Sequence, residues 1–99
     1  LQNYDGDTAL ILACENNYID IVQLLLNHQN INVNLQNYDG DTALILACEN
    51  NYIDIVQLLL KQQNINVNLH DLNNDSALII ACDNNNFNIV KMLLNCVYT

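Results

Sequence analysis

A 34-residue period constrains this chain more than any other feature of its sequence. Residues 1–34 and 35–68 are identical at 32 of 34 positions. Residues 69–99 keep the same register, with 13 identities to the second copy, almost all of them apolar or at element boundaries. Such a period is the signature of repeat architectures, in which each unit buries its apolar face against the next copy. We therefore expect residues 1–99 to form one array of three repeats.

Each repeat contains two short helical patterns and one alternating pattern. Thr8 is suited to cap a helix, and the apolar spacing after it predicts a helix over residues 9–16. Taken alone, this apolar run also fits a buried strand, but the capping Thr8 before it and Asn17 after it favour a helix. A second helix is expected over residues 19–27, and the alternation in residues 31–36 predicts a half-buried strand. The expected core stripe of the second helix consists of Ile21, Val22, Leu25 and Leu26.

Helices of eight or nine residues are too short to be stable alone in water, so these helices must stack on copies of themselves. The expected fold is therefore a mainly α solenoid of helix-turn-helix units joined by hairpin-like loops. The register of the apolar residues argues against a disordered, Asn-rich chain, although 20 of the 99 residues are Asn.

The acidic turn before the first helix poses the question of a metal site. A calcium loop of the EF-hand type needs Gly at its sixth position, an oxygen ligand at its first and Glu at its twelfth. With Gly6 in sixth place, the first and twelfth positions fall on Leu1 and Leu12, so the motif fails. Asp5 and Gly6 instead supply turn chemistry, and Asp7 precedes a helix start, where the helix dipole favours a carboxylate. We expect no metal here.

Cysteine usage points to free thiols. Cys14, Cys48 and Cys82 occupy the same place in successive repeats, about one repeat apart, which exceeds the roughly 7 Å Cα separation that a disulfide tolerates. We expect these three to be buried small apolar residues, and Cys96 to be a partly exposed free thiol. Such usage suits a reducing, intracellular and cytoplasmic compartment, which would be the cytosol of a host cell if the protein is an effector.

No catalytic motif is visible. His28 and His70 do not recur at one repeat position and have no Cys or carboxylate partner at ligand spacing, so we expect both to be surface residues. Two glycines cannot make a Gly-rich phosphate loop, and no Ser-His-Asp order occurs. The carboxylates recur with the repeat, as a scaffold feature does. The expected protein is not an enzyme and uses no cofactor.

The net charge of −9, with Lys61 and Lys91 as the only lysines or arginines, limits the partners. This charge repels the phosphates of nucleic acids and the headgroups of anionic membranes, so neither is an expected partner. The apolar runs are far shorter than the 18 or so residues that span a bilayer. A basic protein surface is the natural complement.

The repeated motifs resemble the ankyrin repeat. The T-P-L-H-x-A motif of that family is matched by TALILA at residues 8–13 and 42–47 and by SALIIA at 76–81, and its I-V-x-L-L-L motif by IVQLLL at 21–26 and 55–60. Ala and Ile replace the family's Pro and His, and the unit has 34 residues in place of 33. A tetratricopeptide array also has period 34, but it needs two longer helices and shorter turns.

The resemblance implies a binding module whose hairpin tips and first helices form a concave surface for protein partners. Position by position, this surface carries eight of the eleven acidic residues and no positive charge. The residues implied in partner binding are Tyr4, Asp5, Asp7, Glu15, Gln36, Tyr38, Asp39, Asp41, Glu49, Asn50, His70, Leu72, Asn73, Asp75 and Asp83.

We expect this acidic surface to bind a basic segment of another protein, with the tyrosines and the leucine of the tips as anchors. Two other interpretations stay open. The surface could be a merely solvated acidic face, as charge runs usually are. The chain could also be a structural solenoid that self-associates weakly through its uncapped ends. The chain starts without Met, and we expect it to be a piece of a longer array; the near-identical copies suggest recent duplication or consensus design.

Overall fold

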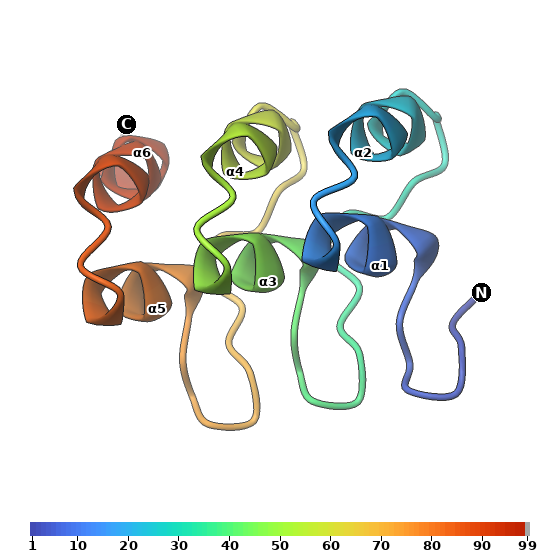
Figure 1. The fold of residues 1–99 in the computed structure, drawn as a ribbon, viewed down its shortest axis with the longest axis horizontal. Helices are drawn as coiled ribbons and strands as arrows, with labels where there is room; N and C mark the ends of the chain where they lie inside the picture. Colours follow the sequence, from blue (N-terminus) through green and yellow to red (C-terminus); the bar gives the residue numbers. More distant parts are fainter. Residues whose placement is uncertain (99) are drawn as a thin grey trace.

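The fold is a stack of three helical hairpins (Figure 1). The computed structural model describes residues 1–98 and the side chains of residues 1–96. In this part of the chain the helices α1, α3 and α5 form one row and α2, α4 and α6 form a second row beside it (Figure 1). The bounds are α1 Ala9–Glu15, α2 Ile19–Leu26, α3 Ala43–Glu49, α4 Ile53–Leu60, α5 Ala77–Asp83 and α6 Phe87–Tyr98. The mainly α solenoid expected from the sequence is confirmed.

The first helix of each repeat begins at the predicted hydroxyl cap. The Thr8 Oγ1 atom accepts a hydrogen bond from the backbone N–H of Ile11 at 3.1 Å, and Thr42 repeats this bond to Ile45. Ser76 makes the corresponding bond at 3.4 Å in the third repeat. Because each hydroxyl satisfies an N–H that has no partner within the helix, these caps fix where the helices begin.

The two helices of a repeat are separated by a left-handed asparagine. Asn17 and Asn51 have φ of 60°, and Asn85 has φ of 55°. Asn is one of the few residues that reach this conformation at low cost, and it reverses the chain directly after the helix. The reversal lets the second helix pack against the first, as the sequence predicted.

The predicted strand over residues 31–36 is wrong. Among the described residues the only β-type pairing is an isolated bridge between His70 and Ser76. The segment turns at Val33 and Asn34, where the Asn34 N–H donates to Oδ1 of Asn32 at 3.0 Å. Asn side chains compete in this way for the backbone groups that a strand ladder needs. Val33, one of the apolar residues of the alternating pattern, is nevertheless buried.

The loops between repeats form hairpin-like tips that are linked to one another. The backbone N–H of Tyr38 donates to the Asp5 carbonyl at 3.1 Å, and that of Leu72 donates to Asp39, also at 3.1 Å. The Gln36 side-chain amide bridges the second and third tips, because it donates to the carbonyl of Gly40 at 2.8 Å and to that of His70 at 2.9 Å. The three tips therefore form one connected row.

Two predictions about the core are wrong at the ends of the stack. Ile21 was expected in the core stripe of α2, but 48% of it is exposed, whereas Ile55 at the same position of the middle repeat is fully buried. Cys82 is exposed, whereas burial raises the pKa of Cys14 and Cys48 to about 12. In each case the missing cover is a neighbouring repeat. Cys96 is an exposed free thiol.

Candidate functional site

The hairpin tips present large side chains to solvent. The exposed fractions are 96% for Tyr4, 69% for Tyr38 and 74% for Leu72. The three tips project from the same side of the helix stack (Figure 1). The ring of Tyr38 lies against Gly6, where a Cβ would come within 2.7 Å of its Cδ1 atom, so glycine is needed at this contact. The tips thus expose three large side chains in a row. Packing inside the protein does not account for side chains of this type at these positions.

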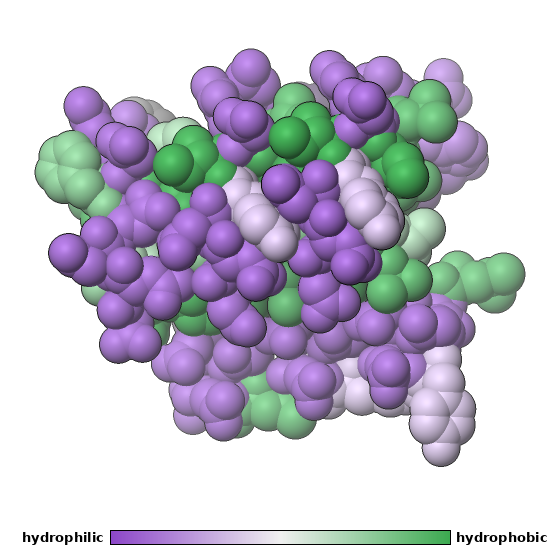
Figure 2. Space-filling model, in the orientation of Figure 1, coloured by the Kyte–Doolittle hydropathy of each residue, from purple (hydrophilic) through white to green (hydrophobic). Residues whose placement is uncertain are grey.

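The acidic residues follow the same side of the stack. Glu15, Glu49 and Asp83 are the last residues of α1, α3 and α5, and all three are exposed. Hydrophilic side chains cover most of the face seen in Figure 2, from the row of tips to the turns between the helices. All fifteen predicted positions are exposed or partly exposed.

Not all of these positions have side chains free to contact a partner. The Gln36 amide is held by its two carbonyl partners in the row of tips. The Asn50 side-chain amide donates to the Leu46 carbonyl at the end of α3, at 2.9 Å. The carboxylate of Asp7 accepts from the side chain of Asn37 at 2.9 Å, which joins the first two repeats. These polar groups act first as links within the protein.

The second junction between repeats differs from the first at one residue. Asp71 occupies the position of Asn37 one repeat later and cannot donate from its carboxylate to Asp41. It is buried, and its Oδ1 atom accepts from the backbone N–H groups of Asn73 and Asp75 at 2.9 Å each. The first junction therefore has an amide beside a carboxylate, and the second has two carboxylates.

Asp71 is one of several carboxylates that lie near Asp41. The pKa of Asp41 is raised from the ordinary value of 3.8 to about 6, first by burial of the carboxyl and then by four nearby carboxylates. In order of effect these belong to Glu49, Asp71, Asp39 and Glu15. Carboxylates from the tips and the first helices of neighbouring repeats therefore raise the pKa of one carboxyl group, that of Asp41. The structure brings these predicted residues together around Asp41.

Asp71 belongs to the group of carboxylates around Asp41, and the sequence prediction did not include it. It lies outside the surface that the resemblance implied, because it is buried at the base of the third tip. A signal was present in the sequence: alignment at the 34-residue period places Asn3, Asn37 and Asp71 at one position. The exchange of an amide for a carboxylate at this position predicts a lost hydrogen-bond donor between repeats.

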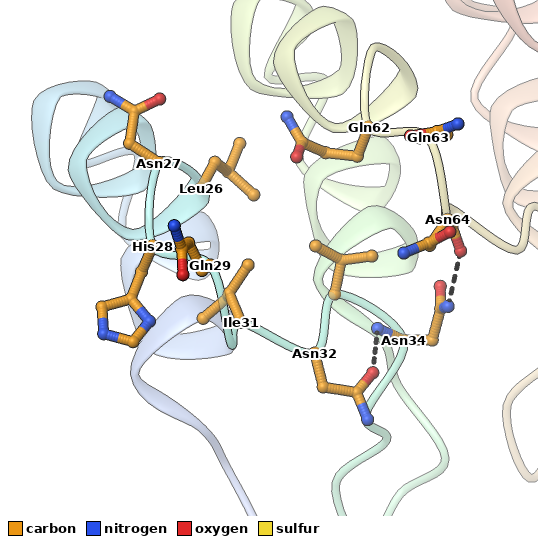
Figure 3. A pocket seen from close by; sticks show the side chains of 11 residues that line it. Leu26, Asn27, His28, Gln29, Ile31, Asn32, Asn34, Gln62, Gln63 and Asn64 are labelled. Carbon is orange, nitrogen blue, oxygen red and sulfur yellow. Dashed lines mark hydrogen bonds between the residues drawn. The ribbon is translucent and has the colours of Figure 1, made fainter.

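A hollow between the loops that follow α2 and α4 is lined mainly by amides (Figure 3). Asn34 donates from Nδ2 to the Asn64 carbonyl at 2.8 Å, and its Oδ1 accepts from the Asn66 N–H at 2.8 Å. His28 is the one titratable residue of its lining. The Asn34 amide joins the two loops, and the lining residues form no set of groups suited to catalysis.

No group of three or more His, Cys, Asp or Glu side chains in the described part of the chain is arranged to hold a metal ion. No helix among residues 1–98 has both the length and the apolar character that crossing a membrane requires.

The fold defines the chain as a repeat solenoid with short paired helices and projecting loop tips. A family model for ankyrin repeats, in three copies, matches residues 1–71 and again 30–98. The chain belongs to the ankyrin repeat family. Members of this family are in general modules for binding other proteins, and in general they are not catalytic. No curated protein matches the chain.

Proposed function

We propose that this protein binds a basic segment of a protein partner through its acidic face, formed by the hairpin tips and the ends of the first helices. One observation carries the proposal. Eight of the eleven acidic residues, and no Lys or Arg, occupy the positions at which ankyrin arrays hold their partners, beside three exposed apolar side chains.

The electrostatics around Asp41 support a cation as the complementary group. Each carboxylate there raises the free energy of ionising its neighbours, and a Lys or Arg side chain between them would reverse this effect. The tips add Tyr4, Tyr38 and Leu72, the kind of side chain that dominates binding energy when a partner covers it. The same negative field disfavours nucleic acids and anionic membranes as partners.

The test is calorimetric titration of the protein with a panel of basic, neutral and acidic peptides of equal length. We expect only the basic peptides to bind, and their affinity to fall as salt rises. Two variants locate the contact: Asp41→Asn and Tyr38→Ala should each weaken binding. Their matched controls, Asp54→Asn on α4 and Tyr18→Ala at the turn before α2, remove an exposed group of the same type elsewhere and should change little.

The release of protons on peptide binding provides an independent measurement. A bound cation lowers the pKa of Asp41 below about 6, so binding near pH 6 releases protons and becomes tighter as pH rises through this value. Titrations in buffers of different ionisation enthalpy measure the release, which Asp41→Asn should reduce. Equal affinity across the peptide panel, insensitive to salt and pH, would contradict the proposal. The acidic face would then be a solvated surface without a dedicated partner.

A second candidate function is structural, as a solenoid that associates with copies of itself. The observation that favours it is the exposure of Ile21 and Cys82, whose equivalents in the middle repeat are buried.

A further inference from the structure

The acidic face presents the same two carboxylates in each repeat. One lies directly before the hydroxyl cap of the first helix and is partly exposed, and the other ends that helix and is exposed. We call each pair a rung, and the rungs are Asp7 with Glu15, Asp41 with Glu49, and Asp75 with Asp83. A partner that follows this face therefore meets one arrangement of charge three times.

Direct packing fixes the distance between successive rungs. The first helices contact one another, α1 with α3 and α3 with α5 (Figure 1), and helix axes in such contacts lie about 8–10 Å apart. The tips are linked as well. The backbone N–H of Tyr38 donates to the Asp5 carbonyl at 3.1 Å, and that of Leu72 donates to Asp39 at the same distance. Successive rungs are therefore about 8–10 Å apart.

A chain that crosses the rungs must bring one basic side chain to each of them. In a polyproline II segment every third residue lies on the same edge, and three residues rise by about 9 Å. A β-strand presents every second residue to one face, so side chains on that face lie about 7 Å or about 13 Å apart and miss the rungs. An α-helix matches only at every seventh residue, about 10 Å along its axis, and needs about 15 residues to reach three rungs. The spacing therefore favours polyproline II.

The exposed side chains of the tips suit the same conformation. Tyr4, Tyr38 and Leu72 are exposed at the same position of the three tips. Segments in the polyproline II conformation bind to surfaces that expose aromatic side chains, because they lose little conformational freedom on binding. Repulsion between like charges also keeps a basic segment extended before it binds.

We propose that the basic segment bound by the acidic face is a polyproline II segment with Lys or Arg at every third position, so that one cation lies on each rung. This inference rests on the proposed function, because it specifies the partner of the same face. The carboxylate of Asp7 already accepts from Asn37, whereas Asp41 lies near Asp71, which has no amide to donate. The middle rung is therefore the place for the sharpest test.

The first test is calorimetric titration of the 99-residue chain with three peptides of equal length and composition. Each contains three lysines among serines, at every second, every third or every fourth position. The peptide with lysine at every third position should bind most tightly, by about fivefold or more, which corresponds to one exposed ion pair. Equal, salt-sensitive affinity for all three peptides would overturn this inference and leave the proposed function intact. Binding of none of them would overturn both.

Proline in the peptide tests the conformation. Replacing the serine after each lysine by proline fixes φ near its value in polyproline II and restricts the preceding lysine to extended conformations. The affinity of the peptide with lysine at every third position should rise, because less conformational freedom is lost on binding. Lower affinity would overturn the assigned conformation. So would tighter binding of a helical, Ala-rich peptide that carries lysine at every seventh position.

The middle rung tests the register within the protein. Asp41→Asn with Glu49→Gln removes its two charges and keeps the side-chain shapes, and circular dichroism checks the fold. Replacing the middle lysine of the every-third peptide by serine should weaken binding to the wild-type chain by about fivefold and binding to this variant little. The control variant, Asp20→Asn with Asp54→Asn, removes two exposed carboxylates from the second helices and should keep the full loss. An equal loss in the two variants would overturn the register.

Discussion

The two junctions between repeats differ in one residue: the amide of Asn37 at the first junction is replaced by the carboxylate of Asp71 at the second. Where Asn37 donates to Asp7, the carboxylate has a fixed partner, and where Asp71 stands, Asp41 faces a second negative charge. Burial of the Asp41 carboxyl, and then the nearby carboxylates of Glu49 and Asp71, make the folded protein hold the proton of Asp41 more tightly than the unfolded chain does. Because the pKa rises on folding, the contribution of Asp41 to stability is largest below about pH 4 and is lost as pH rises to about 6.

Asp71→Asn should stabilise the protein at pH 7. The new amide can keep the backbone bonds that Asp71 accepts and donate to Asp41, as Asn37 does to Asp7. One such hydrogen bond is worth about 0.5–1.5 kcal/mol in the free energy of unfolding. Urea denaturation from pH 4 to 7 measures the gain, which should grow as pH rises.

The control for Asp71→Asn is Asp54→Asn, which removes the same charge from an exposed position on α4. If both variants stabilise the protein equally, net charge alone is the cause, and the carboxylate pair at the second junction has no special role.

At the scale of elements, local chemistry fixes the helix ends. Thr8 and Asn17 bracket the first helix, and both act within four residues of their own position. Such features are visible in a sequence, which is why the helix bounds were predicted to within a residue. The strand over residues 31–36 was not, because alternation alone does not reveal that Asn32 takes the backbone N–H of Asn34.

The left-handed turn at Asn17 gives a direct test. Asn17→Ala should lower the free energy of unfolding by about 1–2 kcal/mol, because a Cβ without a polar group has no compensation at φ of 60°. Asn17→Gly should be neutral within a few tenths of a kcal/mol, since glycine adopts this conformation freely. The matched site is Asn27, where φ is −79° and alanine should cost little. An equal loss at both positions, measured by urea denaturation, would contradict this account of the turn.

At the scale of the whole molecule, burial depends on place in the stack. Ile21 and Ile55 have the same neighbours in sequence, and one is half exposed while the other is buried. The sequence of a single repeat does not distinguish the two positions. The predicted burial of Ile21, and likewise that of Cys82, was therefore wrong. The exposure of the acidic side chains depends on repeat position and was therefore predictable, whereas the raised pKa of Asp41 depends first on its burial and then on Glu49 and Asp71, which only the folded chain brings near it.

Ile55→Ala and Ile21→Ala make the same chemical change in the two copies. Removing the buried side chain of Ile55 should cost about 2–5 kcal/mol, by lost transfer energy and the cavity left behind. Ile21→Ala should cost less than half as much, because solvent already reaches the site. Denaturation at low protein concentration and low salt keeps the measurement on single chains. Equal losses would show that a repeat's stability is set within the repeat.

The match between successive junctions has a consequence for how such a protein changes length. The first two repeats present the same side chains on each face, so another copy of residues 35–68 placed between them would meet surfaces already suited to it. Each added copy brings one more tip and one more pair of helices. A gene segment duplicated in frame can thus yield a folded product at once, and the binding face can be lengthened before any residue in it is altered.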